Sequence, residues 1–491
     1  MTSMTAAVAT SVSLATVSGY EDGFARAHLP PPAQWPELCF DLPELHYPAR
    51  LNATAALLDA AVAAGGGARI AVVGERESWT YRELQERVDR IAHVLRRDLG
   101  LATGKRVLLR GANTPMMAAC ILAVFKAGCI AVPTMPLLRA RELGVIIDKA
   151  RVDAVLCAAR LRAELDAVTT QPSVIFFDDL DDADALEARM AHHEEPFAAC
   201  DSAADDVCLI SFTSGTTGVP KATMHFHRDL LAICDCFPRH TLGTRADDIF
   251  IGTPPLASRT GTASLRQSVS AGEALPVATR TAWQEATGLR MVDGIGATEL
   301  LHIFISAAGD AVRAGATGKP VPGYRACILD VAGAPVGPGV VGRLAVKGPT
   351  GCRYLDDPRQ ADYVCDGWNL TGDAYEMDAD GYFYYRARTD DMIISAGYNI
   401  AGVEVEDALL RHPAVAECAV VGRADAERGM VVEAHVVLRA GVARDEATSA
   451  ALQAFCKAQI APYKYPRVIH YADQLPRTET GKLQRFKLRD A

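Results

Sequence analysis

Strand and helix signals alternate along the first part of this 491-residue chain. Thr80 and Glu83 form a capping-box pattern, and apolar residues then recur at helical spacing as far as Leu95. Alternating strands and helices favour a parallel sheet with helices on both faces, so the predicted fold class is α/β. The predicted strands span 106–109, 129–133, 154–157 and 174–177, and a buried helix is predicted over 113–126.

The region after residue 322 has a different pattern. Short apolar runs at 327–329 and 344–346 lie between glycine and proline turns, and Asp380-Gly381 precedes an aromatic run at 382–385. An Asp-Gly pair before such a run is typical of a β-hairpin. We therefore expect a small β-rich subdomain here.

The last hundred residues alternate again, which predicts a compact α+β domain of ordinary size. Helices are expected over 404–412 and 447–459, and strands over 416–421 and 434–438. Because the chain is too long for one hydrophobic core, we predict two domains. The first, 1–389, holds two parallel-type sheets and the β-rich subdomain, and the second is the small domain 390–491.

Composition excludes several classes of protein. Hydrophobic residues make up 49% and charged residues 22%, which is typical of a globular protein. The net charge of −10 argues against a protein that binds a nucleic-acid backbone. The longest apolar run, 116–125, is too short to span a bilayer, and no charged segment of a signal peptide precedes Arg26. The 13 cysteines include no Cys-x-x-Cys pair, so we expect free thiols in a cytoplasmic protein. The charge and the short apolar runs predict no nucleic-acid or membrane partner.

A segment rich in glycine and hydroxyl side chains follows an apolar run at 207–212, which is predicted to be a buried strand. Glycines expose backbone N–H groups, hydroxyls add donors and a lysine adds charge, which together favour a polyphosphate cradle. The Walker spacing is absent, and an ordinary Ser/Thr/Gly turn is the alternative. The candidate residues are Thr213, Ser214, Gly215, Thr216, Thr217, Gly218 and Lys221.

Four further motifs follow in order, and each alone has an ordinary explanation as a turn, a helix start or an exposed charge. They are Asp293 to Glu299 (DGIGATE), Thr371 to Asp373 (TGD), Arg388 to Ile400 (RTDDMIISAGYNI) and Pro476 to Lys482 (PRTETGK). Taken together with the glycine-rich segment, they resemble the adenylate-forming superfamily, which includes acyl-CoA synthetases, luciferases and peptide-synthetase adenylation domains. The resemblance covers essentially the whole chain.

The resemblance implies that ATP, Mg²⁺ and CoA are used. It places the triphosphate on the 213–218 loop and Lys221, and the adenine and α-phosphate against Gly294. Thr298 would bond the phosphate or the carboxylate, and Glu299 would hold Mg²⁺, for which a carboxylate oxygen is suited. Ala222 stands where the family usually has glycine.

The same resemblance assigns the later motifs to the ribose and to a moving lid. Asp373 would bind the ribose hydroxyls, and Arg388 the ribose and phosphate. Gly397 would line the path of the thiol, and Lys482 would swing in with the mobile C-terminal domain to stabilise charge on the α-phosphate. Val403 replaces the family's proline before Glu404, which loosens that loop slightly.

Strings around these motifs resemble bacterial aryl-CoA ligases, in particular 2-aminobenzoate-CoA ligases. They include KATMHFHRDL from Lys221 and GIGATELLHIFIS from Gly294. The resemblance places His227, as a catalytic candidate, and His302 near the aryl acid. A lone histidine is more often a satisfied core residue, and that alternative stays open.

The chain is short between Ala257 and Ser268. Members of the superfamily carry roughly two βαβ units more at this point. The missing part normally supplies strands of the second sheet and much of the wall of the aryl pocket. We expect a deletion after about residue 257, uncovered apolar neighbours, and either poor folding or a repacked subdomain with a damaged acid pocket.

The expected function is ATP-dependent activation of an aromatic acid, benzoate or 2-aminobenzoate, as aryl-AMP, and its transfer to CoA, in the degradation of aromatic compounds. One alternative is the loading of an aryl acid onto a carrier protein. The other is an inactive homologue damaged by the gap. The expected partner is a small aryl acid, and the sequence leaves a homodimer open.

Overall fold

The computed structural model describes residues 17–75, 77–170, 172–179, 181–213, 220–251, 265–272, 275, 277–395, 398–425, 427–477, 481 and 483–489. The chain divides into two compact units. The first comprises Met1–Asp235, Thr298–Leu301 and Lys347–Gly367, and the second Cys236–Ala297, His302–Val346 and Trp368–Ala491. The boundary expected at 389/390 lies within the second unit and stays a prediction.

A six-stranded sheet forms the centre of the first unit, with strand order β6-β5-β3-β4-β7-β8. The first five strands in this order pair in parallel, and β8 pairs antiparallel with β7. The predicted parallel sheet is therefore confirmed, with an antiparallel edge strand added. The strands are β3 Arg106–Arg110, β4 Ile130–Thr134, β5 Ala154–Ala158, β6 Ser173–Phe177, β7 Val207–Thr213 and β8 Lys221–Phe226, and a separate hairpin joins β1 Ile70–Val73 to β2 Ser78–Thr80.

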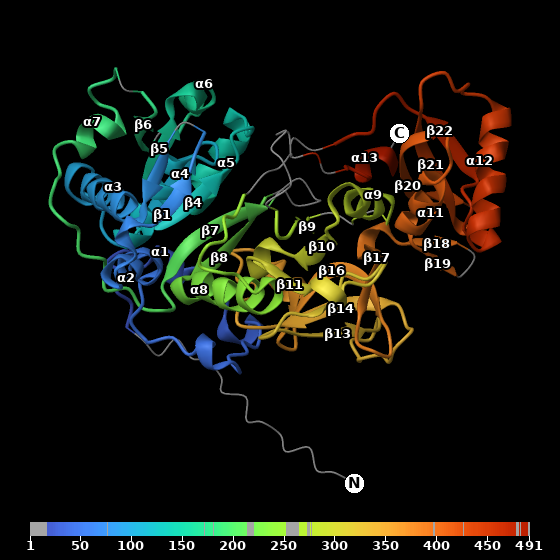
Figure 1. Cartoon of the computed structure of the whole chain (residues 1–491), viewed down its shortest axis with the longest axis horizontal. Helices are drawn as coiled ribbons and strands as arrows, with labels where there is room; N and C mark the ends of the chain where they lie inside the picture. The colour runs from blue at the N-terminus through green and yellow to red at the C-terminus, as the bar shows by residue number, and fades with distance from the viewer. Residues whose placement is uncertain are drawn as a thin grey trace, which may run out of the picture. The chain divides into compact units, whose positions relative to one another are not determined.

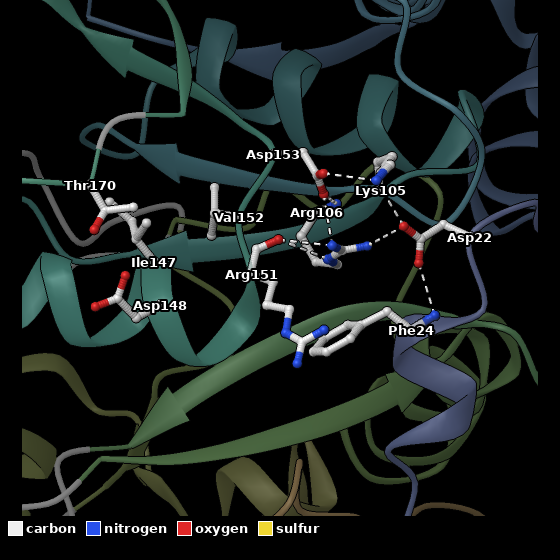
Figure 2. A pocket seen from close by; sticks show the side chains of 10 residues that line it. All are labelled: Asp22, Phe24, Lys105, Arg106, Ile147, Asp148, Arg151, Val152, Asp153 and Thr170. Carbon is white, nitrogen blue, oxygen red and sulfur yellow. Dashed lines mark hydrogen bonds and ion pairs between the residues drawn. The ribbon is translucent and has the colours of Figure 1, made fainter.

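Helices cover both faces of this sheet (Figure 1). Two separate cores result. Along β3, Val107 and Leu109 pack into one core and Leu108 into the other, as the two-residue period of a strand requires. The capping box is confirmed at α3, where Glu83 N–H donates to Thr80 Oγ1 and Thr80 N–H donates to Glu83. The helices of this unit are α1 Phe24–Ala27, α2 Ala60–Ala63, α3 Tyr81–His93, α4 Pro115–Lys126, α5 Ala140–Ala150, α6 Arg162–Asp166, α7 Leu186–Met190, α8 His227–Cys236 (whose last residue falls in the second unit) and α10 Gln360–Tyr363.

The second unit contains three sheets. One has the strand order β12-β11-β10-β9, a β-rich sheet places β14 beside β16 and β16 beside β17, and the third is β19-β18-β21-β20 with β22 beside β21. Their strands are β9 Val269–Ala271, β10 Val292–Gly296, β11 Ile303–Ala307, β12 Lys319–Pro320, β13 Arg325–Leu329, β14 Gly342–Lys347, β16 Trp368–Met377, β17 Phe383–Arg388, β18 Ile393–Ser395, β19 Tyr398–Ile400, β20 Val415–Asp425, β21 Gly429–Leu438 and β22 Val468–Tyr471. The helices are α9 Val277–Thr287, α11 Gly402–Leu410, α12 Glu446–Gln459 and α13 Phe486–Arg489, and the short β15 Val364–Cys365 follows α10.

The hairpin predicted at Asp380-Gly381 joins β16 to β17, and Gly381 has φ +80°. The left-handed conformation there suits glycine because a Cβ would be strained. The sheet that contains β10 is more mixed than expected. Among the described strands of this sheet, β9 and β10 pair in parallel and the other pairs are antiparallel, and β9 is three residues long.

Apolar side chains are exposed beside the expected deletion. Ile249, Phe250 and Ile251 are 78, 67 and 72% exposed, and Val269 of β9 is 44% exposed. Residues 252–264, which include the junction at Ala257, lie outside the described part of the chain. These exposed side chains fit the uncovered apolar neighbours expected beside the deletion, which itself stays a prediction.

The 13 cysteines are free thiols, and nine of them are buried. In α8, Cys236 is buried and Cys234 is exposed, so the two side chains point different ways, as expected. Within the described residues, no helix combines the length and apolar character needed to cross a bilayer.

Candidate active site

The phosphate-loop motif begins and ends on the antiparallel pair β7–β8 in the first unit. Thr213 at the end of β7 is the cross-strand partner of Lys221 at the start of β8. Ala222 is fully buried and pairs with Phe212, so its methyl group packs in the core. The residues between, Ser214, Gly215, Thr216, Thr217 and Gly218, lie outside the described chain, and their role stays a prediction.

Lys221 and Glu299 meet through the hydroxyl of a third residue, Tyr354. Lys221 Nζ donates to Tyr354 Oη at 3.3 Å, and that hydroxyl donates to Glu299 Oε1 at 2.5 Å. Lys221 Nζ also lies 5.1 Å from the centre of the Tyr354 ring. Burial, followed by the charges of Cys352 and Glu299, raises the pKa of Tyr354 well above its usual value, so the hydroxyl keeps its proton. A cation and a carboxylate from separate motifs are thus assembled in one buried place.

The short turn that carries Thr298 and Glu299 is held by one hydrogen bond from a distant residue and one within the turn. Thr350 Oγ1 donates to Leu300 O at 2.8 Å, and Leu301 N–H donates to Thr298 O at 3.2 Å. Glu299 is 9% exposed and Thr298 is half-buried. A hard carboxylate oxygen held at the edge of a buried cluster fits Mg²⁺, which binds through one or two carboxylates and keeps several waters.

The glycine turn that precedes Thr298 ends β10 in the second unit. Gly294 is buried, and a Cβ there would come within 2.7 Å of the Ile303 side chain. At Gly296 a Cβ would come within 2.7 Å of the His302 carbonyl oxygen. Both glycines are therefore required by the close packing of β10 and β11, whatever else they contact.

The candidate ribose residues face each other across β16 and β17, also in the second unit. Asp373 and Arg388 are cross-strand partners, and Arg388 Nη1 donates to Asp373 Oδ1 at 3.1 Å and to Thr371 O at 3.1 Å. Gly372, between Thr371 and Asp373, has φ +77°, and a Cβ there would meet Arg388 Nη2 at 2.7 Å. The Thr-Gly-Asp motif, expected as a turn, lies within β16 and holds a buried carboxylate in a fixed orientation, which suits a ligand with two neighbouring hydroxyls.

Sequence reasoning gave no role to Asp293, which begins the Gly294 motif. Burial raises its pKa to about 6, although Arg280 of α9 lies 3.3 Å away and acts in the opposite direction. A buried carboxylate with a raised pKa in a nucleotide motif is a functional candidate on physical grounds. The sequence signal was its place at the start of the motif.

His227 is fully buried and both of its ring nitrogens have partners. Ala53 N–H donates to Nδ1 at 3.1 Å, so the proton sits on Nε2, 2.9 Å from Tyr20 Oη. Burial lowers the pKa of His227 to about 3. These contacts favour the satisfied core histidine over the catalytic role, which remains a prediction without support in this geometry.

His302 packs against Phe237 with ring centres 5.2 Å apart, and burial lowers its pKa. Its Nδ1 is buried with no hydrogen-bond partner among the described residues. This ring therefore has an unused polar atom, as a substrate-facing histidine would have. The assignment to the aryl acid stays a prediction.

Two other candidates, Gly397 and Lys482, lie outside the described residues, so their roles stay predictions. In the part of the chain that is described, one group of possible metal ligands appears away from these motifs: His93, His193 and Glu195. His93 Nε2 donates to Glu195 O at 3.1 Å, and the Glu195 carboxylate pairs with Arg97. His193 Nε2 lies 3.0 Å from Asp98 Oδ1, so all three groups are already engaged.

A fully buried ion pair lies beside the end of β8, and sequence reasoning missed it. Arg353 Nη1 lies 2.8 Å from Asp229 Oδ2, and both side chains are 0% exposed. Asp229 Oδ2 also accepts from Phe226 N–H at 3.0 Å at the start of α8. The pair fixes the segment before Tyr354 against the end of β8, and its partners are 124 positions apart, which left no local signal.

The chain belongs to the AMP-binding enzyme family, whose profile matches residues 59–265 and 258–353. The AMP-binding enzyme C-terminal domain matches residues 404–482. The two parts of the first match meet at 258–265, where the deletion was expected. The predicted superfamily and the α/β fold are therefore confirmed.

The chain is 33% identical to a benzoate–CoA ligase of Thauera aromatica over 91% of this chain and 98% of that protein. It is 30% identical to a 3-hydroxybenzoate–CoA ligase of Aromatoleum sp. (strain CIB) over 90% and 97%. An anthranilate CoA ligase, solved in complex with anthranoyl-AMP, superposes with TM-score 0.84 at 28% identity and covers 91% of this chain and 98% of that one.

The alignment with the Thauera aromatica enzyme is longer than this chain. It extends over 515 positions, more than the 491 residues of the whole chain. The relative therefore carries residues that this chain lacks, which supports the expected deletion.

Proposed function

We propose that this protein is an AMP-forming aryl-CoA ligase that uses ATP, Mg²⁺ and CoA, with benzoate or 2-aminobenzoate as its acid. The observation that carries the proposal is the Lys221–Tyr354–Glu299 cluster at the end of the β7–β8 pair. It joins a phosphate-binding cation to a carboxylate suited to Mg²⁺. The similarity to three aromatic acid–CoA ligases over about nine-tenths of the chain supports the class of acid.

In the proposed first step, a carboxylate oxygen of the acid attacks the α-phosphorus of ATP and the bond to pyrophosphate breaks. Lys221 binds the polyphosphate, and Asp373 with Arg388 orients the ribose. When bound, magnesium supplies charge neutralisation on the phosphate oxygens, and Glu299 is the residue that would hold it. In the second step the CoA thiol attacks the acyl carbon, AMP leaves with the bonding electrons, and a thioester forms.

The test is acid-dependent exchange of labelled pyrophosphate into ATP by the full chain. Benzoate, 2-aminobenzoate and 3-hydroxybenzoate are compared with acetate, and the product formed with CoA is identified by its mass. Exchange with an aryl acid and an aryl-CoA product support the proposal. Exchange without a thioester until a carrier protein is added would favour the carrier-loading alternative.

A second candidate function, nucleotide binding without catalysis, is favoured by the gap and by the exposed Ile249, Phe250 and Ile251 beside it. Folded protein that binds MgATP but shows no exchange with any acid would establish it. For an active enzyme, Lys482→Ala is expected to depress adenylation far more than thioester formation from supplied aryl-AMP. Equal losses would contradict the role proposed for Lys482.

A further inference from the structure

Tyr354 occupies a position that none of the five motifs explains. Its side chain is 1% exposed, although its hydroxyl contacts one charged residue on each side. A buried hydroxyl between an ammonium and a carboxylate both accepts and donates a hydrogen bond, so it is oriented by both charges. The contacts of Tyr354 are therefore more specific than packing requires.

The backbone of Tyr354 is fixed independently of that hydroxyl. Gln360 Oε1 accepts from Tyr354 N–H at 2.8 Å, and Gln360 Nε2 donates to the Gln34 and Cys352 carbonyl oxygens. A β-bridge joins the residue to Thr223 of β8, two positions beyond Lys221. The backbone that carries the Tyr354 ring is thus held in place beside the strand that carries Lys221.

We propose that Tyr354 is a positioning residue that fixes the Glu299 carboxylate for the magnesium ion of MgATP and keeps this carboxylate from pairing directly with Lys221. The inference rests on the proposed function, because that function assigns the metal to Glu299. It adds a third residue, outside the recognised motifs, on which metal binding depends.

The physical reason is competition between two partners for one carboxylate. Lys221 Nζ and Glu299 Oε1 approach the same hydroxyl, at 3.3 Å and 2.5 Å, so the tyrosine oxygen stands between them. In a buried site, opposite charges released from such a spacer attract strongly and would form a direct pair. That pair would remove a ligand from the metal and a cation from the phosphates.

The test is ATP binding by the full chain, measured by calorimetry at several free Mg²⁺ concentrations. Tyr354→Phe removes only the hydroxyl. Loss of a partner that orients a metal ligand typically lowers metal affinity 10- to 100-fold, so the Mg²⁺ needed for half-maximal ATP binding is expected to rise by about that factor. ATP binding without Mg²⁺ should change less than about twofold, since the variant retains Lys221 and the nucleotide contacts.

Tyr363→Phe is the matched control. Tyr363 packs edge-on against Tyr354, with ring centres 5.8 Å apart in the same small cluster, and its loss of a hydroxyl leaves both Tyr354 bonds in place. Its Mg²⁺ requirement should equal that of the wild type. In a Glu299→Gln background, Tyr354→Phe should add less than about twofold, because the two residues act as one unit.

An unchanged Mg²⁺ requirement in folded Tyr354→Phe would overturn the inference. Equal weakening with and without Mg²⁺ would overturn it too, because it would place the effect on the nucleotide. If Tyr354→Phe does not fold, Glu299→Asp tests the same bond from the other side by withdrawing the carboxylate from the hydroxyl, and an unchanged Mg²⁺ requirement there would count against the proposal. Wild-type protein that binds ATP with no Mg²⁺ dependence would instead refute the proposed function.

Discussion

The six-stranded sheet of the first unit is well buried, whereas the four-stranded sheet of the second unit is partly exposed to solvent. In the first, β3 is buried along its whole length, and helices provide a core on each face. In the second, β9 has three residues and its first, Val269, is 44% exposed. The strands that carry Lys221 and its neighbours thus belong to a well-covered sheet. The sheet that contains β9 has less cover, so the two regions should respond differently to mutation.

The sharpest contrast is between a buried and an exposed ion pair. Arg353→Met leaves the Asp229 carboxylate buried without its cation, which typically costs about 3–5 kcal/mol. Arg290→Met in the second unit breaks the exposed pair with Asp310, and little change is expected. Urea denaturation measures both. Equal effects would show that the buried pair does not stabilise the first unit.

Burial of apolar side chains gives the next largest difference in the free energy of unfolding between the two sheets. Leu108→Ala removes a fully buried side chain from β3 and should lower the free energy of unfolding by about 2–5 kcal/mol. Val269→Ala in β9 should change it by less than about 0.5 kcal/mol, because that side chain is already partly exposed. A large loss in Val269→Ala would mean that β9 is covered in solution, for example by a second copy of the chain.

Acid should destabilise the first unit through its buried histidines. The pKa of His227 is lowered to about 3 and that of His225 to about 4, both chiefly by burial, whereas an unfolded histidine titrates near 6.5. Between those values the unfolded chain binds more protons, so stability is fully present above about pH 6.5 and falls as the pH drops, by up to about 1.4 kcal/mol per unit for each histidine.

His227→Gln should flatten this slope in melting curves recorded between pH 7.5 and pH 5. His192→Gln, which changes an exposed histidine of the same unit, serves as the control and should leave the slope unchanged. A slope equally steep in His227→Gln would show that His227 is not the buried neutral group described above.

The smallest expected effect concerns Gly372 in β16 of the second unit. Gly372→Ala places a Cβ at φ +77° and 2.7 Å from Arg388 Nη2, and should cost about 1–2 kcal/mol and weaken ATP binding. Gly337→Ala, at a glycine with open space around it, is the control in the same unit. If ATP titration gave the two variants equal affinities, Asp373 and Arg388 would not contribute to nucleotide binding.

Features set by neighbouring residues could be predicted from the sequence. The capping box at Thr80 and the turn at Gly381 depend on contacts within a few positions, and both are present. The cluster at Tyr354 could not be predicted, because Tyr354 and Glu299 are 55 residues apart and only the folded chain brings them together. The shape of the sheet that contains β9 also escaped prediction, since a three-residue strand has too few positions to show a period.

The cross-strand pair Thr213–Lys221 has a consequence for how tightly a nucleotide can be held. Folding of the sheet already brings together the two ends of the seven residues between β7 and β8, so the entropy of closing that ring is lost before any ligand arrives. A ligand that binds this segment does not have to offset that entropy again, which favours tight binding by a short segment. Lengthening the ring by inserted residues should therefore weaken ATP binding gradually and leave the sheet itself intact.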